Sequence, residues 1–341
     1  MSKRSAPKKR RSPKYKKYVI FALSFLVSLL FLFSIFGIAF FRRGLVAALS
    51  QESTLPLYDD NFMSFAYIVV DDLENEVPQI QEGSFVFVDK SSKKIIKYTI
   101  PQDMKVEVVG KFLEEDFSKL YAISLLNTND KPQYIINASL QKIFGYPVER
   151  HVFVSGDMDK ELGQSFWSGD LLGIANGFDL IGQSTKYSTN FSVSELYDLM
   201  LFINSLPEDR HVDFILSKTY QNDSTLIDDQ IQDITFDSKI AREDLSIAVL
   251  NGTDISGLAS SVSRMIKNLG GRVVAMQNSE NTYSKSVIVT DKPNSVSAQL
   301  FSNLFEITDI LAPSQLNMDQ EYMVGRADLT IIIGVDLSSR L

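Results

Sequence analysis

The stretch LSIAVLNGTDISGLASSVSRMIKNLGGRVV, residues 245–274, decides the fold of the C-terminal part of the chain. An apolar run meets an Asn-Gly-Thr turn, after which apolar residues recur at three- and four-residue intervals and predict one buried helix face. Those residues are Leu258, Val262, Ile266 and Leu269. Gly270 and Gly271 are typical of a helix end. The pattern predicts strand, helix and strand over 245–250, 255–269 and 272–276.

The turn at the start of this helix has some features of a phosphate-binding loop. Gly252 and Gly257 have the spacing of the two glycines in G-x-x-x-x-G-K-[ST], but Leu258 stands where that loop needs a lysine. Asp254 supplies its own negative charge, and we predict that it caps the helix. We therefore interpret the turn as structural rather than phosphate-binding. Its residues are Asn251, Gly252, Thr253, Asp254 and Gly257.

A second strand–helix–strand pattern follows the first. Strands are predicted in SVIVT (286–290) and DLTIIIG (328–334), with a helix in NSVSAQLFSNLF (294–305) between them. Two β-α-β passes in succession predict a small α/β domain of the split β-α-β kind over residues 245–341.

The region before this domain also mixes strands and helices. Strands are predicted at 65–70, 84–88, 94–100 and 105–109, the second and third forming a hairpin. One helix ends at Gly145, and another over 192–206 carries an apolar stripe that we interpret as core. Residues 63–218 are thus predicted to form a larger α/β domain. Residues 219–244 are interpreted as an extended linker, in which DITF (233–236) is a candidate edge strand.

The N-terminus differs in composition from everything that follows. Residues 1–17 form a basic tail with nine Lys or Arg, and residues 18–41 include 23 uncharged residues, Val19 to Phe41. A helix of that length crosses a bilayer of about 30 Å. Nine basic residues before the span and two after it predict a cytoplasmic N-terminus and an external body. Residues 42–62 are interpreted as a stalk, and cleavage within LVAALS (45–50) stays an alternative to a permanent signal-anchor.

Charge and composition exclude several kinds of site. The chain lacks Cys and has two His, so we expect neither thiolate nor imidazole metal sites. Beyond residue 51 lie 23 basic and all 42 acidic side chains, a balance that repels nucleic acid. The pairs Asp59-Asp60 and Asp228-Asp229 lack calcium-loop spacing and are interpreted as solvated charge. Ser24 and Ser28 have the small-xxx-small spacing of a membrane-span dimer.

The C-terminal pattern resembles a known family. LSIAVLNGTDISGLASSVSRMIKNLGGRVV, then SVIVT, then RADLTIIIGVDL (326–337) is similar to the LytR C-terminal domain over about 245–337. That module occurs in bacterial cell-envelope proteins of the LytR–CpsA–Psr type. The resemblance implies an envelope location and binding to peptidoglycan or to another envelope protein. It implies no catalytic role.

Residues 63–218 resemble the larger domain of the same proteins, which transfers a glycopolymer from a lipid pyrophosphate to the cell wall. The similar segments are FVFVDKSSKKIIKYTIPQDMKV (85–106), INASLQKIFGYPVERHVFVS (136–155) and YSTNFSVSELYDLMLFINSLPEDR (187–210). Where the family has Pro-Arg-Asp, this chain has Pro101-Gln102-Asp103. Gln102 lacks the charged fork that matches phosphate oxygens, and the resemblance is therefore to a degenerate domain.

These observations lead to a hypothesis of function. We expect a single-pass, membrane-anchored envelope protein with an extracellular or periplasmic body that is not an enzyme, takes no cofactor and binds wall glycan or an envelope partner. One alternative is an active glycopolymer phosphotransferase, in which Asp103 is the residual catalytic or magnesium-binding candidate and lysines replace the missing arginine. Those lysines are Lys97, Lys105 and Lys111. The other alternative, a membrane-bound transcription attenuator, is disfavoured by the acidic body.

Overall fold

The computed structural model describes residues 62–108, 113–126, 131–157, 159, 167, 187–217, 224–316 and 323–338. Leu55–Phe191 and Glu195–Leu341 form one compact unit. The predicted basic tail, membrane span and nearly all of the stalk lie outside the described residues, as do Asp59-Asp60, Ser24 and Ser28. Within the described residues, none of the helices has the length and hydropathy needed to cross a membrane.

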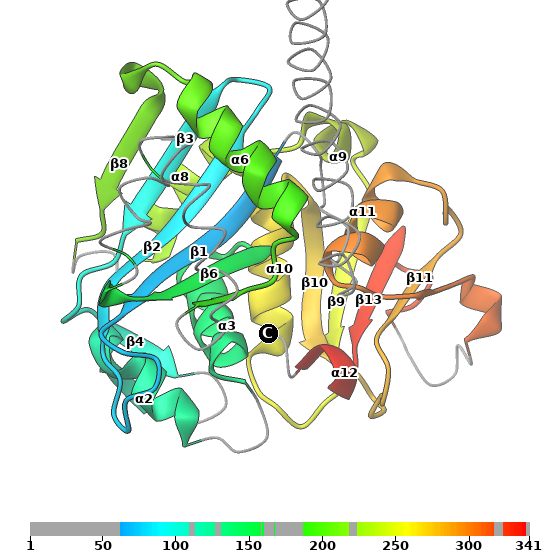
Figure 1. Ribbon diagram of the computed structural model, residues 1–341. Coiled ribbons are helices and arrows are strands. Elements are labelled where there is room, and N and C mark those ends of the chain that lie inside the picture. The colour runs from blue at the N-terminus through cyan, green and yellow to red at the C-terminus, as the bar shows by residue number, and fades with distance from the viewer. Residues whose placement is uncertain are drawn as a thin grey trace, which may run out of the picture. The chain divides into compact units, whose positions relative to one another are not determined.

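A six-stranded mixed sheet forms the centre of the first domain, in the order β7-β6-β1-β2-β3-β8 (Figure 1). Its strands are β1 (Phe62–Val70), β2 (Ile80–Asp89), β3 (Lys94–Thr99), β6 (Arg150–Ser155), β7 (Tyr187–Thr189) and β8 (His211–Ile215). The β2–β3 hairpin is antiparallel, as predicted. β1 pairs parallel with β6, and β3 pairs parallel with β8.

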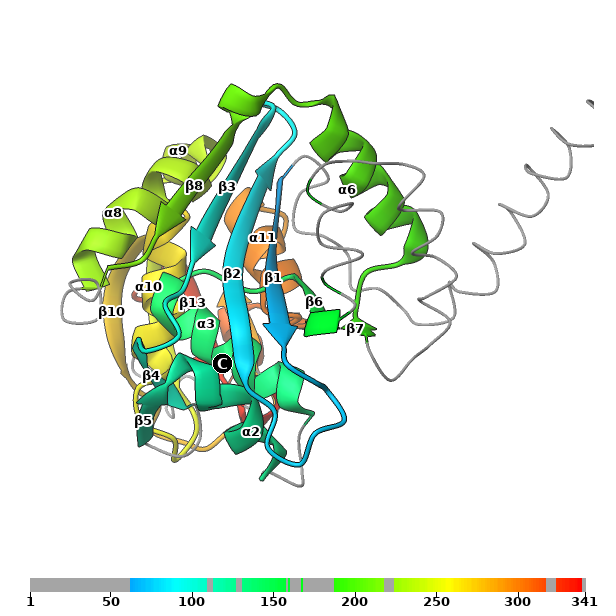
Figure 2. The ribbon, with the colours of Figure 1, turned by 60° about the vertical axis from the view of Figure 1, so that its left-hand side comes forward.

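Both faces of this sheet are buried, which explains the continuous apolar runs in β1 and β2. Alternate residues of β1 point to opposite faces: Ile68 belongs to one core and Phe65 to another. The first core lies toward α3 and the second toward α6 (Figure 2). The remaining elements of this domain are β4 (Lys105–Val108), β5 (Leu113–Asp116), η1 (Phe117–Lys119), α2 (Leu120–Leu125), α3 (Pro132–Phe144), α6 (Val193–Ser205) and η2 (Glu208–Arg210).

The two helices predicted in this domain are confirmed. α3 ends at Phe144, and Gly145 takes the left-handed conformation with φ 56° that ends many helices. The α6 stripe is core: Leu196, Leu199, Met200 and Ile203 are buried.

The C-terminal domain contains a five-stranded sheet in the order β10-β9-β13-β11-β12. Its strands are β9 (Ser246–Asn251), β10 (Arg272–Asn278), β11 (Val287–Thr290), β12 (Asp309–Leu311) and β13 (Leu329–Ile333). Its other elements are α10 (Leu258–Asn268), α11 (Val296–Leu304), η3 (Pro313–Gln315) and α12 (Val335–Ser338).

The prediction of a split β-α-β arrangement is wrong. β9 and β10 are parallel neighbours, so the first predicted β-α-β unit is not split. The second predicted unit, from β11 to β13, is not a β-α-β unit, because these two strands pair antiparallel and α11 leads to β12, the parallel neighbour of β11. Instead β13, whose five residues are all buried, lies between the two units and pairs with β9 and β11. A strand with apolar side chains on both faces buries the most apolar surface in this central position. The three-residue strand β12 was not predicted.

The start of α10 also differs from the prediction. The helix begins at Leu258, and its N-cap is Gly257 with φ 90°, not Asp254. The turn between β9 and the helix is therefore longer than the apolar pattern indicated. The predicted apolar face is confirmed, because Leu258, Val262, Ile266 and Leu269 are all buried.

The prediction of an extended linker is wrong as well. Residues 224–243 contain two helices, α8 (Ser224–Thr235) and α9 (Ser238–Glu243). Ile227 and Ile231, four residues apart, place their side chains in the core, and so does Ile240. The acidic composition concealed a helical spacing that buries these isoleucines, while Asp229 and Asp233 are exposed.

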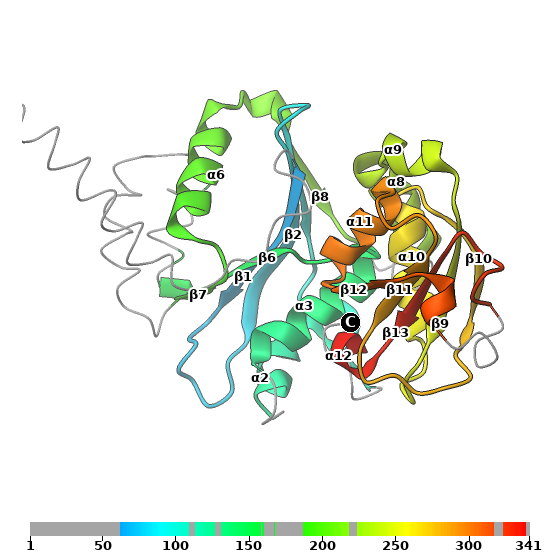
Figure 3. The ribbon, with the colours of Figure 1, turned by 90° about the vertical axis from the view of Figure 1, so that its right-hand side faces the viewer.

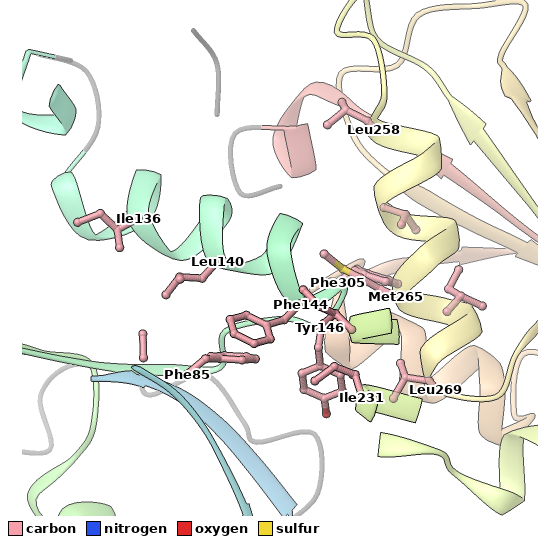
Figure 4. Close-up of a cluster of buried hydrophobic side chains, with 14 of the residues drawn as sticks. Phe85, Ile136, Leu140, Phe144, Tyr146, Ile231, Leu258, Met265, Leu269 and Phe305 are labelled. Carbon is pink, nitrogen blue, oxygen red and sulfur yellow. The ribbon is translucent and has the colours of Figure 1, made fainter. Parts of the chain in front are cut away.

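The two domains share one hydrophobic core. Figure 3 shows α6, the first sheet, α3 and then the C-terminal domain in succession. In Figure 4, Phe144 and Tyr146 lie between the end of α3 and the helices opposite, near Met265, Leu269 and Phe305. Both aromatic side chains are fully buried there. The C-terminal domain is thus packed against the first domain rather than tethered beside it.

Candidate functional site

The α6 side of the first sheet carries a group of polar side chains that we call the sheet-face cluster: Tyr67, Glu82, Ser84, Lys97, Asp159 and Trp167. Strand register brings them together, because Tyr67 is opposite Ser84 and Val86 is opposite Lys97, so their side chains share one face. The hydrophobic core under α6 surrounds them. Polar groups inside an apolar face indicate either a ligand site or the remains of one.

Lys97 is the only cation of this cluster. Its ammonium lies 2.8 Å from Glu82 Oε1 and 5.0 Å from the centre of the Trp167 ring. The Lys97 side chain is 19 % exposed and that of Glu82 is 42 % exposed, so water screens the ion pair in part. Lys97 is therefore neutralised by Glu82.

Tyr67 forms the second polar contact of the cluster. Its hydroxyl donates to Asp159 Oδ1 at 2.6 Å. Burial, together with the Asp159 carboxylate, raises the pKa of Tyr67 far above its usual range. The hydroxyl therefore stays protonated and acts as a donor. The described residues of the cluster thus include two carboxylates and one paired ammonium.

The Pro101-Gln102-Asp103 segment forms the turn between β3 and β4. Met104 N donates to Pro101 O, and Ser118 N donates to Gln102 O, both at 3.0 Å. The Gln102 amide donates to Gln81 O, so it is held against the start of β2. Asp103 is exposed in the same turn.

The lysines proposed as substitutes for arginine have other partners. Lys97 pairs with Glu82, and Lys105 Nζ lies 2.7 Å from Asp116 Oδ1. Lys111 lies outside the described residues. Among the residues that the structure covers, no three His, Asp or Glu side chains gather in a metal-binding arrangement.

Arg150 is the buried arginine of the first domain, at 2 % exposure. From β6 it donates to Glu195 Oε1 of α6 through Nε at 3.3 Å and Nη2 at 2.8 Å. Its Nη1 donates to Glu149 O at 3.0 Å. The Arg150 guanidinium thus joins strand β6 of the sheet to helix α6.

His151, next along β6, points to the opposite face. Its Nδ1 lies 3.1 Å from Asn137 Nδ2 of α3. Burial, with smaller contributions from Lys131 and Arg150, lowers the pKa of His151 to about 4. This histidine is a neutral packing group at pH 7. His211 is half-buried on the edge strand β8.

The interpretation of Asp228 as solvated charge is wrong. Its Oδ1 lies 2.7 Å from Arg264 Nε of α10, and both side chains are only about a fifth exposed. The pairing joins α8 to α10. Asp229 is exposed.

In the C-terminal domain, Asn251 organises the turn before α10. Its Oδ1 accepts from Thr253 N at 3.1 Å and from Thr253 Oγ1 at 2.8 Å, while its Nδ2 donates to Ile255 O at 2.7 Å. Gly252 N donates to Ile333 O at 2.9 Å. A Cβ at Gly252 would approach that oxygen to 2.8 Å, so only glycine fits. These backbone donors bond within the protein, and Asp254 is exposed beside them.

The finishing motif of the domain has a similar structural role. Asp336 Oδ1 accepts from Ser286 N at 2.8 Å and from Ser286 Oγ at 2.7 Å, and Ser286 Oγ accepts from Gly334 N at 2.9 Å. The Gly-x-Asp sequence thus fastens the end of β13 to the start of β11.

Residues 244–336 match the protein family described as LytR cell envelope-related transcriptional attenuator. This segment is a LytR C-terminal domain. The match begins and ends one residue before the predicted 245–337. The LytR C-terminal domain therefore covers β9 to the middle of α12.

Solved structures similar to this chain are also of the LytR–CpsA–Psr type. TagV of B. subtilis is 11 % identical with a TM-score of 0.36, covering 47 % of this chain and 85 % of its own. TagT of B. subtilis is 13 % identical with a TM-score of 0.34, covering 52 % of this chain and 97 % of its own. No curated protein matches the sequence. The family match relates residues 244–336 to cell-envelope proteins and assigns no residue roles.

The sequence interpretation missed most of the sheet-face cluster. Lys97 was named, but Tyr67, Glu82 and Trp167 were not. A polar residue inside an apolar strand was the available signal, as in KIIKYT of β3. Which polar residues meet depends on strand order and register, and these follow from pairing between distant segments.

Proposed function

We propose that this chain is a membrane-anchored, non-catalytic protein of the bacterial cell envelope whose external body binds cell-wall glycan or another envelope protein. The LytR C-terminal domain and the relation to LytR–CpsA–Psr proteins support the envelope location. The apolar segment 19–41 with its preceding basic tail supports the anchor.

One observation carries the non-catalytic part of the proposal. Where the resembling enzymes have an arginine, the Gln102 amide is bonded to Gln81 O. The nearby cation Lys97 is neutralised by Glu82. Removing one preorganised donor at a site of developing charge typically raises a barrier by about 3–4 kcal/mol, so transfer from a pyrophosphate is strongly disfavoured.

A transfer assay tests this part. The full-length protein is incubated with magnesium and a lipid-pyrophosphate-linked glycan, and released lipid is measured. We expect release at the protein-free level, both for the wild type and for Asp103→Ala. Release by the wild type that Asp103→Ala abolishes would establish the transferase alternative instead.

A sedimentation assay tests the binding part. The full-length protein is mixed with isolated wall sacculi, and the pelleted fraction is measured against protein concentration. We expect saturable pelleting. The 245–341 fragment is unsuitable because α10 shares its core with α3 and α8. If the protein neither pellets with sacculi nor cross-links to an envelope protein in cells, the binding function is refuted.

A further inference from the structure

The end of α3 meets two polar side chains of the C-terminal domain. The last carbonyls of a helix lack partners within it and carry the negative end of the helix dipole. Here Arg264 Nη1 donates to Lys142 O, and Nη2 donates to Ile143 O at 2.9 Å. Asn268 Nδ2, one turn further along α10, donates to Gly145 O at 2.9 Å. A helix end of one domain is thus capped by side chains of the other.

A carboxylate from a third helix completes this contact. Asp228 Oδ1 of α8 accepts from Arg264 Nε at 2.7 Å and from Asn268 Nδ2 at 3.1 Å. All three guanidinium nitrogens of Arg264 therefore donate, and the cation has a counter-ion. A planar fork makes these contacts at once, which a lysine ammonium does not.

The residues around this contact are closely packed. Gly145 has φ 56°, and a Cβ there would lie 2.6 Å from Asn268 Nδ2 and 2.8 Å from Arg264 Nε. Asn268 is 1 % exposed, and its Oδ1 accepts from Gln232 Nε2 of α8 at 3.2 Å. Phe144 and Tyr146, on either side of Gly145 in the chain, are fully buried in the shared core (Figure 4).

We propose that Arg264, Asn268 and Asp228 form an interdomain clamp that makes the first domain and the LytR C-terminal domain unfold as one cooperative body. The module then works as a fixed part of the whole protein rather than as an independent binding unit. This inference does not depend on the ligand or on the absence of catalysis.

The experiment follows the two domains separately in the full-length protein during urea unfolding. Trp167 is the only tryptophan and stacks against Phe65, so its fluorescence reports on the first domain. Hydrogen exchange of the β9 and β13 amides reports on the C-terminal domain. The variants are Arg264→Met and Arg264→Lys. The matched control is Arg272→Met, because Arg272 pairs with the exposed Asp244 near its own strand.

We expect the two wild-type transitions to coincide, as for a two-state body. In Arg264→Met, the amide protection factors of β9 and β13 should fall by roughly 10–100-fold, because hydrogen bonds to a charged group are lost. The C-terminal domain should then unfold at a lower urea concentration than the first domain, which Trp167 reports. In Arg264→Lys, the transitions of the two domains should separate by less. This variant serves as the test if Arg264→Met does not fold. Arg272→Met should keep the transitions together. Separate wild-type transitions, or coincident transitions in folded Arg264 variants, would overturn the proposal.

Discussion

Arg150 shows how one residue fixes two elements. A cation at 2 % exposure is unfavourable unless it is paired and hydrogen-bonded, and here Glu195 and the Glu149 carbonyl do both. Because β6 supplies the cation and α6 the carboxylate, the pair determines how the helix lies on the sheet. The sequence contained both residues, but their 45-residue separation left no signal that they meet.

The first prediction removes the charge of Glu195. Glu195→Gln leaves the Arg150 cation buried without its counter-ion, so we expect the free energy of unfolding to fall by about 3 kcal/mol. Urea denaturation followed by Trp167 fluorescence measures this. The control is Glu115→Gln, whose partner Lys119 is exposed, with an expected change below about 1 kcal/mol. Equal losses in both variants would contradict a special role for the buried pair.

The second prediction concerns His151 and pH. In the unfolded chain this imidazole takes a proton near pH 6.5, but in the folded protein its pKa is about 4. Between these values the unfolded state binds a proton that the folded state does not, so stability is lost as pH falls through this window. At roughly 1.4 kcal/mol per pKa unit, the loss reaches about 3 kcal/mol.

His151→Gln should remove this part of the pH dependence. The measurement is the free energy of unfolding at pH 7 and at pH 4.5, for this variant and for His211→Gln as control. We expect the difference between the two pH values to shrink only in His151→Gln. An unchanged difference would show that another group governs the acid sensitivity.

At the level of elements, most strands and helices were predictable from periodicity. The runs that became β1, β2, β9 and β13 are long and apolar, and the stripes of α6 and α10 repeat at helical spacing. α8 and α9 were missed because a polar, acidic segment was given more weight than the spacing of its isoleucines. β12 has three residues, too few for a periodic signal.

Strand order and the contents of the candidate site were not predictable in the same way. The position of β13 between two β-α-β units depends on which sequence-distant strands pair, and no local pattern encodes that choice. The sheet-face cluster likewise depends on the register of β1, β2 and β3. The replacement of arginine by Gln102 was visible, but its bond to Gln81 was not.

The third prediction concerns the glycine that ends α3. Gly145→Ala and Gly257→Ala both force a side chain into a left-handed backbone, but only the new Cβ at Gly145 meets Asn268 and Arg264. We expect Gly145→Ala to lower the free energy of unfolding by roughly 1–3 kcal/mol more than Gly257→Ala does. Thermal and urea unfolding measure both variants. If both variants lose the same free energy of unfolding, the end of α3 accommodates the new Cβ without strain.

For the whole molecule, the unequal placement of charge predicts topology. Nine basic residues precede the apolar segment, and the chain beyond residue 51 is strongly acidic. We predict that β-lactamase fused after Leu341 protects cells from a β-lactam, whereas a cytosolic fluorescent reporter at the same place stays dark. The control lacks residues 1–41 and should reverse both results. A fluorescent full-length fusion would place the body inside the cell instead.

The packing of the two domains also bears on what happens when the chain is truncated. Phe144 and Tyr146 are fully buried at the junction, beneath the LytR C-terminal domain. A nonsense codon near Asp244 would remove the α10 and α11 side chains from this shared core, and contiguous apolar surface exposed in this way promotes aggregation. We therefore expect such a truncated chain to aggregate rather than to fold as a shorter protein.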